Sequence, residues 1–119
     1  MEEGRRFFII EERPDCVDVA HIVTKDLMVV IETALYRWRY NHSPYERRHC
    51  NFYYVCSMIE RVDDNGNWHQ DSNTMKDYVD IIELEKRLRK RKDDFHEKYP
   101  DDYYTEEAKD IELYLKERG

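Results

Sequence analysis

The chain has 119 residues, of which 20 are basic and 27 acidic, so its formal net charge is −7. This length suits one domain and is too short for two ordinary ones. The acidic balance argues against a protein whose whole surface tracks DNA, because such domains are usually basic. Small acidic chains without a recognisable motif are common among phage and viral accessory proteins, an analogy that rests on composition alone.

The expected location is the cytoplasm, or the host cytoplasm if the protein is viral. The N-terminal segment MEEGRRFFIIEERP has only four consecutive apolar residues, far fewer than the apolar part of a secretory signal. The longest aliphatic run, Leu27 to Ile31, is five residues long, so we expect no membrane partner. Cys16, Cys50 and Cys56 are an odd number of cysteines, and we expect all three thiols to stay reduced.

The first predicted element is a buried strand over residues 5–12, RRFFIIEE, which Pro14 ends. For residues 16–24 the sequence does not decide between a helix and a strand. A helix is predicted over 27–40, because apolar residues recur there at three- and four-residue spacings, and Asp26 offers an N-cap. The competing interpretation is a hairpin with VDVAHIV and LMVVIE as its strands, since Val and Ile are dense in both.

A polar loop around Pro44 is followed by the clearest strand, residues 51–62, NFYYVCSMIERV, which is rich in aromatic and β-branched residues. The next residues, DDNGNW, predict a type I′ turn at Asn65-Gly66, because both residues tolerate positive φ. A short return strand is then expected over 67–70. These strands predict a small antiparallel sheet, packed by the helix before it.

Two helices are predicted in the C-terminal part. Thr74 and Asp77 resemble a helix N-terminus, so the first helix is expected over 75–99 and ends at Pro100. The second is expected over 105–117, where acidic residues in the first turn favour a helix.

The expected fold class is therefore α+β, with residues 1–119 forming a single domain. The compact core is expected mainly in 1–70, and the helical C-terminal part covers 71–119. The two C-terminal helices have narrow apolar stripes, and such helices gain stability mainly by packing on something. A homodimer or a complex with another partner is therefore expected.

Catalytic and cofactor motifs are absent from the sequence. It has no GxSxG, no P-loop and only three glycines, so we expect no catalytic residues and no cofactor. It also lacks the close Cys and His pairs typical of zinc sites, so we expect no bound metal. A metal-dependent hydrolase remains an alternative, with Glu60, Asp63 and Asp64 beside the hairpin as its carboxylates, although acids at hairpin turns more often form the turn.

The candidate binding segment is residues 36–49, YRWRYNHSPYERRH, which carries four arginines against one acid, Glu46. Arginine with interleaved aromatic rings suits single-stranded nucleic acid, and the same residue types dominate protein interfaces. The structural alternative is that Trp38 belongs to the core and that arginine stems cover aromatic rings. The candidate residues for partner or nucleic-acid binding are Arg37, Arg39, Tyr40, Tyr45, Arg47 and Arg48.

A second basic cluster, Lys86–Lys92, is predicted to be a solvated, salt-bridged helix face. Acids four residues away offer partners, with Glu83 for Arg87, Glu85 for Arg89 and Asp94 for Lys90. The acidic segment 99–119 is expected to pair with this cluster in the same fold.

The function expected from these observations is that of a small non-enzymatic interaction protein, such as an accessory factor or inhibitor that occupies another macromolecule's surface. A protein is the preferred partner. The alternatives are a nucleic-acid-binding module that uses residues 36–49 and, third, the metal-dependent hydrolase.

Overall fold

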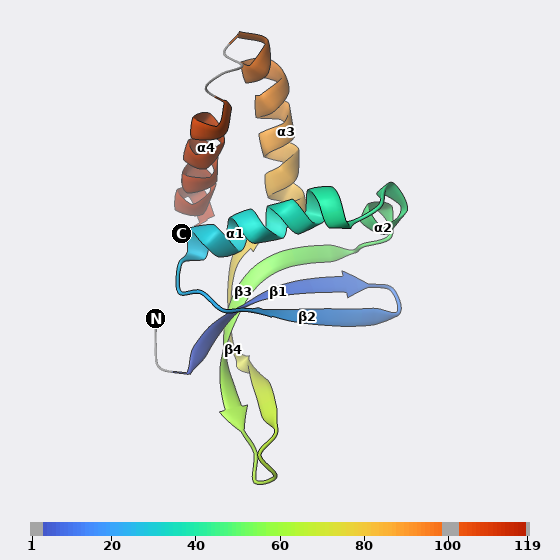
Figure 1. The fold of residues 1–119 in the computed structure, drawn as a ribbon, viewed down its shortest axis with the longest axis vertical. Helices are drawn as coiled ribbons and strands as arrows, with labels where there is room; N and C mark the ends of the chain where they lie inside the picture. Colours follow the sequence, from blue (N-terminus) through green and yellow to red (C-terminus); the bar gives the residue numbers. More distant parts are fainter. Residues whose placement is uncertain (1–3, 99–102, 119) are drawn as a thin grey trace. The chain divides into compact units, whose positions relative to one another are not determined.

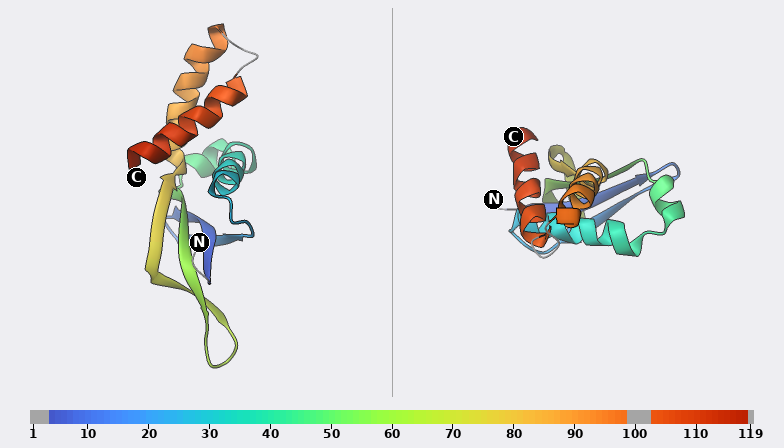
Figure 2. Two further views of the ribbon diagram at one scale, coloured as in Figure 1. Left: turned by 90° about the vertical axis from the view of Figure 1, so that its left-hand side faces the viewer. Right: turned by 90° about the horizontal axis from the view of Figure 1, so that it is seen from above.

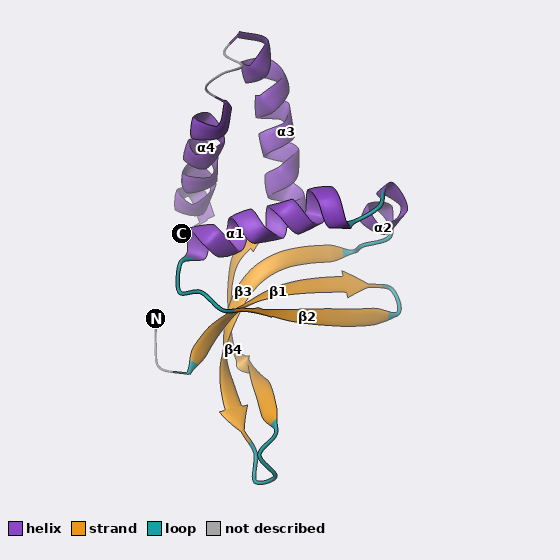
Figure 3. Cartoon of the chain, in the orientation of Figure 1, coloured by secondary structure: helices purple, strands orange, loops and turns teal. Residues whose placement is uncertain are grey.

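The computed structural model describes the backbone of residues 4–98 and 103–118 and the side chains of residues 4–89 and 107–117. The fold is α+β, as predicted, with a four-stranded antiparallel sheet accompanied by helices (Figures 1 and 3). Contacts along the chain divide it into two compact units, Met1–Ile81 and Ile82–Gly119.

The sheet of the first unit has the strand order β2-β1-β3-β4, and every neighbouring pair is antiparallel. The strands predicted over 5–12 and 51–62 are confirmed. The open stretch 16–24 contains a strand, so the first half of the hairpin alternative was right and its second half, which is helical, was wrong. The strands are β1 (Arg5–Arg13), β2 (Cys16–Ile22), β3 (Phe52–Val62) and β4 (Trp68–Asp80).

The helix predicted over 27–40 is confirmed, but its last turn is wider than expected. The helix α1 (Leu27–Tyr36) begins at Asp26, whose side chain accepts a hydrogen bond from the backbone N–H of Met28 at 3.0 Å. The chain then continues as a π-helical turn, η1 (Arg37–Asn41). Such turns are rare. The carbonyl groups at the end of any helical run have no intrahelical donor and need another partner.

The segment predicted as a polar loop around Pro44 contains a short helix, α2 (Pro44–Arg48). Ser43 begins it with a capping box, in which the Ser43 hydroxyl accepts from the N–H of Glu46 and the Glu46 carboxylate accepts from the N–H of Ser43. Both bonds satisfy backbone groups that a helix start leaves open. The loop prediction missed this Ser-Pro-x-Glu signal.

The central strand β1 is buried on both faces. The ring of Trp38 lies 5.2 Å from that of Tyr53, which places Tyr53 on the sheet face under the helices. Side chains alternate along a strand, so Phe7 and Ile9 share that face. The opposite face holds a separate apolar cluster of Phe8, Ile10, Cys56 and Met58, with Tyr54 packed against it. Burial on both faces explains why the run FFII shows no polar alternation.

The short return strand predicted over 67–70 is confirmed but is longer than expected, since β4 runs to Asp80, and the prediction of a helix starting at Met75 was wrong. The Thr74 hydroxyl accepts from the backbone N–H of Ile59 at 2.8 Å and donates to the carbonyl of Asp71 at 2.6 Å. These bonds lie where the register between β3 and β4 shifts. The threonine that resembled a helix cap therefore supports a β-bulge.

The turn between β3 and β4 is not the predicted type I′ turn. Among the described residues only glycines have positive φ, so Asn65 does not take the conformation that this turn requires. The N–H of Gly66 donates to the carbonyl of Asp63 at 3.0 Å, and the N–H of Asp63 donates to the carbonyl of Asn67 at 2.9 Å. The result is a three-residue loop with a left-handed glycine. This loop lies at the end of the hairpin arm, the part of the β3–β4 hairpin that extends beyond β1 (Figure 2).

The second unit contains two helices, α3 (Ile81–Lys98) and α4 (Tyr103–Arg118). The helix predicted over 75–99 therefore starts six residues later than expected, and the one predicted over 105–117 is confirmed. Leu84, Leu88 and Ile111 of the predicted apolar stripes are buried. The side chains of Lys90, Asp94 and Phe95, and the helix-ending Pro100, lie outside the described residues.

The basic cluster of α3 pairs with the acidic end of the chain, as predicted. Arg87 donates to both carboxylate oxygens of Glu117, at 2.7 and 3.3 Å, whereas the predicted partner Glu83 acts on Arg87 through its charge. The hydroxyl of Tyr114 donates to Glu83 at 3.2 Å instead. The predicted pair of Glu85 with Arg89, by contrast, is confirmed at 3.2 Å.

Candidate interaction surface

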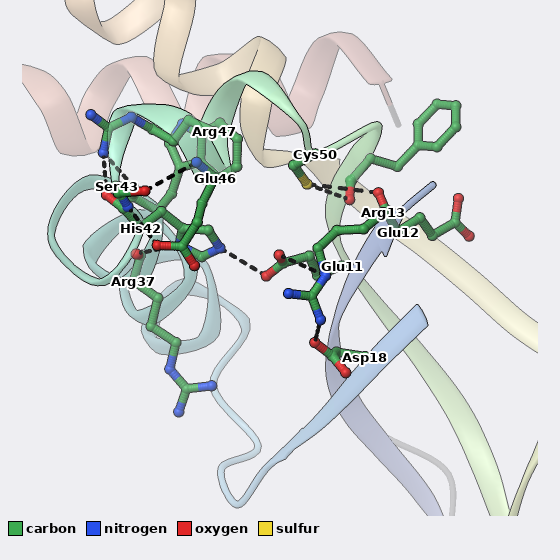
Figure 4. A network of polar contacts seen from close by, with 12 residues as sticks. Glu11, Glu12, Arg13, Asp18, Arg37, His42, Ser43, Glu46, Arg47 and Cys50 are labelled. Carbon is green, nitrogen blue, oxygen red and sulfur yellow. Dashed lines mark hydrogen bonds and ion pairs between the residues drawn. The ribbon is translucent and has the colours of Figure 1, made fainter. Parts of the chain in front are cut away.

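The candidate binding segment, residues 36–49, forms the end of α1, the π-helical turn and the short helix α2. The six predicted residues therefore come from two consecutive helical segments, which meet at His42 and Ser43 (Figure 4). Arg37, Arg39 and Tyr40 lie in η1, whereas Tyr45, Arg47 and Arg48 lie in α2.

Trp38 lies in the core, so the structural alternative is right for this residue. Its ring contacts the rings of Tyr53 and His42, each at 5.2 Å, and the rings of His42 and Tyr53 lie 5.1 Å apart. Burial, and then the charge of Glu11, raises the pKa of Tyr53 to about 12. The three rings join the π-helical turn to the sheet.

His42 fastens the end of η1 by both nitrogens of its ring. Its Nδ1 lies 2.8 Å from the carbonyl oxygen of Arg37, and its Nε2 lies 2.8 Å from Oε1 of Glu11 in β1 (Figure 4). A carbonyl oxygen can only accept, so Nδ1 carries a proton and donates it. Sequence reasoning missed this pair, because a histidine in a polar stretch carries no signal for a carboxylate 31 residues earlier.

Arg13 extends this network to the second strand. Its Nε lies 3.7 Å from Oε2 of Glu11, and its Nη2 donates to the carboxylate of Asp18 (Figure 4). The contacts run from β2 through β1 to His42. They fix the position of the candidate segment relative to the sheet.

Arg47 acts inside the segment and is not a free surface cation. Its Nη1 donates to the carbonyl oxygens of His42 at 2.7 Å and of Trp38 and Arg39 at 3.3 Å. These carbonyls lie at the end of a helical segment, where carbonyl groups have no intrahelical N–H donor. The guanidinium group of Arg47 therefore caps η1 and ties α2 to it.

The remaining aromatic side chains of the segment face solvent. Tyr36, Tyr40 and Tyr45 are 59, 70 and 63% exposed. The rings of Tyr36 and Tyr40 lie 5.0 Å apart, and Tyr45 stacks on His49 at 4.0 Å. The sequence-based site omitted Tyr36, although its spacing of four residues from Tyr40 on a helix could have included it.

Arg48 is exposed, while Arg37 and Arg39 are half-buried. In Figure 4 the side chain of Arg37 points away from the polar network. The one acid of the segment, Glu46, is held by the capping box, and the hydrogen bonds from Ser43 lower its pKa. We define the Tyr-Arg surface as the exposed Tyr36, Tyr40, Tyr45 and Arg48 together with the half-buried Arg37.

Of the carboxylates considered for a hydrolase, that of Asp63 is used by the hairpin turn. Asp63 accepts from the N–H groups of Asn65 and Asn67 through Oδ1, each at 2.9 Å, and its Oδ2 lies 2.7 Å from His69 Nε2. The bond from His69, followed by those from the backbone, lowers the pKa of Asp63. Within the described part of the chain, no group of three or more His, Cys, Asp or Glu side chains could hold a metal ion.

The three cysteines differ in burial. Burial raises the pKa of Cys50 to about 11 and that of Cys56 to about 12, whereas Cys16 is exposed. At pH 8 we expect DTNB to modify one thiol per chain rapidly and all three after unfolding, since the thiolate is the nucleophile. The variant Cys16→Ser should lose the rapid phase. Rapid reaction of two thiols in the folded protein would contradict this prediction.

Comparison with protein-family models, with curated proteins and with solved structures finds no match. The described helices include none with the length and apolar character needed to cross a membrane.

Proposed function

We propose that the protein binds another protein through the Tyr-Arg surface and acts without catalysis, as an accessory factor or inhibitor. The observation that carries this proposal is the group of three exposed tyrosines, which lie beside arginines on consecutive helical segments. Tyrosine and arginine are enriched among the residues that supply most binding energy in protein interfaces.

The surface is held in place before any partner arrives. Arg47 bonds three carbonyls of the segment, and His42 joins it to β1. The tyrosine rings contact neighbours four residues away, which limits their rotation. A preorganised surface loses less conformational entropy on binding, so more of the contact energy appears as affinity.

The arginines of the Tyr-Arg surface favour a protein partner that presents individual carboxylates to them. The guanidinium groups of Arg37 and Arg48 lie on a chain whose net charge is −7. A single-stranded nucleic acid needs a positive groove that follows several phosphates, and the acidic remainder of this chain repels such a strand. Arginine can instead form bidentate pairs with individual carboxylates of a protein.

The test is affinity capture from the native cell with the full chain as bait, compared with the double variant Tyr40→Ala/Arg48→Glu. We expect the variant to recover at least tenfold less of the captured partner, because truncated hot-spot residues cost about 2 kcal/mol or more. Both side chains project from the surface, so the thermal melt should stay unchanged. Trp68→Ala is the matched control, since it removes an exposed aromatic ring outside the Tyr-Arg surface.

Equal recovery by the wild type and the double variant would contradict the proposal. The nucleic-acid alternative is measured in parallel with a labelled single-stranded oligonucleotide. Affinity for it that falls steeply with salt, and that the double variant loses, would replace the protein partner by a nucleic acid.

A further inference from the structure

The two edges of the sheet differ in how well they could pair with another strand. Edge strands present unpaired backbone N–H and C=O groups, and proteins blunt them with bulges and charges. The register of β4 on β3 shifts twice, between Val55 and Cys56 and between Ser57 and Ile59. Its central part also exposes Lys76 and Asp77. This edge is therefore poorly suited to pairing with another chain.

The other edge, β2, has no bulge and carries a single carboxylate, that of Asp18. Its register on β1 runs without a shift from Phe7↔Ile22 to Arg13↔Cys16. Val17 and Val19 are 59 and 46% exposed, and β-branched residues favour strand pairing. A regular strand with exposed valines is the kind of edge that accepts another strand.

The direction of the free backbone groups follows from the neighbouring pair. The carbonyl of Glu12 accepts from the N–H of Asn51 at 2.8 Å, so its backbone groups point towards β3 and away from β2. Opposite residues in an antiparallel pair alternate between bonded and non-bonded. Glu12 lies opposite Val17, so the backbone groups of Val17, Val19 and His21 point to the free edge. These three residues are symmetric about Val19.

The charge of β2 does not oppose contact between two copies of an acidic chain. Its one carboxylate, that of Asp18, accepts from Arg13. The ring of His21 packs on Phe8, with the ring centres 5.4 Å apart, and its Nε2 lies 4.0 Å from Glu60. Strand pairing here places no like charges directly opposite one another, since Asp18 would face Ala20 and His21 would face Val17.

We propose that β2 pairs antiparallel with β2 of a second copy, centred on Val19, and joins the two sheets into one. The dimer has two-fold symmetry, in which each copy presents the same strand. The outward N–H and C=O groups of Val17, Val19 and His21 then bond their counterparts. The sequence led us to expect self-association through the C-terminal helices, whereas this proposal places it at the sheet edge.

The first experiment is sedimentation velocity of the full chain from low to high micromolar concentration. We expect the wild type to shift from monomer to dimer. Val19→Pro removes an N–H that points to the free edge, so it should spare the bonds to β1 and weaken self-association at least tenfold. Val19→Lys should also weaken self-association, because it places like charges opposite each other at the centre of the pair. This variant tests the proposal if Val19→Pro fails to fold. The control Val19→Thr keeps the N–H and the β-branched shape and should still form the dimer.

The second experiment locates the contact. In a Cys16→Ser background, Val19→Cys should give a cross-linked dimer with a short bis-maleimide, and Lys76→Cys on the opposite edge should not. A wild type that stays monomeric at high micromolar concentration would overturn the proposal. So would a dimer that survives both Val19→Pro and Val19→Lys, or one that cross-links equally well through Lys76→Cys.

Discussion

Trp38→Ala is expected to lower the free energy of unfolding by about 3–5 kcal/mol, the usual range for a large buried aromatic side chain. Trp38 is only 6% exposed, and its ring packs on both Tyr53 and His42. Alanine would leave a cavity between η1 and the sheet and remove both ring contacts. Urea denaturation followed by far-UV circular dichroism measures the change.

Trp68→Ala is the matched control, because Trp68 is 63% exposed on the hairpin arm. We expect it to change the free energy of unfolding by about 0.5 kcal/mol or less, as for most surface substitutions. Equal effects of the two tryptophan variants would show that Trp38 does not join the helical segment to the sheet.

Arg47→Ala is expected to lower the free energy of unfolding by about 2 kcal/mol, since hydrogen bonds to charged groups contribute about 1.5–3 kcal/mol. The guanidinium group bonds the carbonyls of Trp38, Arg39 and His42 at the end of η1. Without it these carbonyls lose their donor, and α2 loses a link to η1. The measurement is the same urea titration.

Arg48→Ala provides the comparison, since Arg48 is the exposed neighbour of Arg47 in the same short helix. We expect this variant to unfold within about 0.5 kcal/mol of the wild type. If both alanine variants retain wild-type stability, Arg47 belongs to the exposed surface. A destabilised Arg47→Ala beside a stable Arg48→Ala supports the separation of the capping arginine from the Tyr-Arg surface.

The elements that the sequence predicted correctly have a dense local signal. The run FFII in β1 and the aromatic and β-branched residues of β3 indicate strands without help from distant residues. The second half of β4 has no such signal. Thr74 resembles a helix cap, but its hydroxyl bonds Ile59 and Asp71 across a bulge. Pairing with β3 thus overrode the local pattern, and a distant partner of this kind cannot be read from nearby residues.

The sequence predicted which segment forms the candidate site, but it did not predict the contacts that each residue of the segment makes. Arg47 and Arg48 are adjacent and chemically identical, yet one caps a helical turn and the other is exposed. The acceptors of Arg47 are backbone carbonyls, which every residue possesses, so no residue type in the sequence identifies them. The bond from His42 to Glu11 joins residues far apart in the chain and was equally hidden.

The strand order also has a consequence for how the chain folds. β2 follows β1, and β4 follows β3, through short turns, and such hairpins form within microseconds. The central pairing of β1 with β3 joins Glu12 to Phe52 across β2 and all the helical segments between them. Closing this loop costs conformational entropy before the central contacts form. We therefore expect the meeting of the two hairpins to limit the rate at which the sheet folds. Until they meet, both edges of the β1–β2 hairpin can pair with other chains and aggregate.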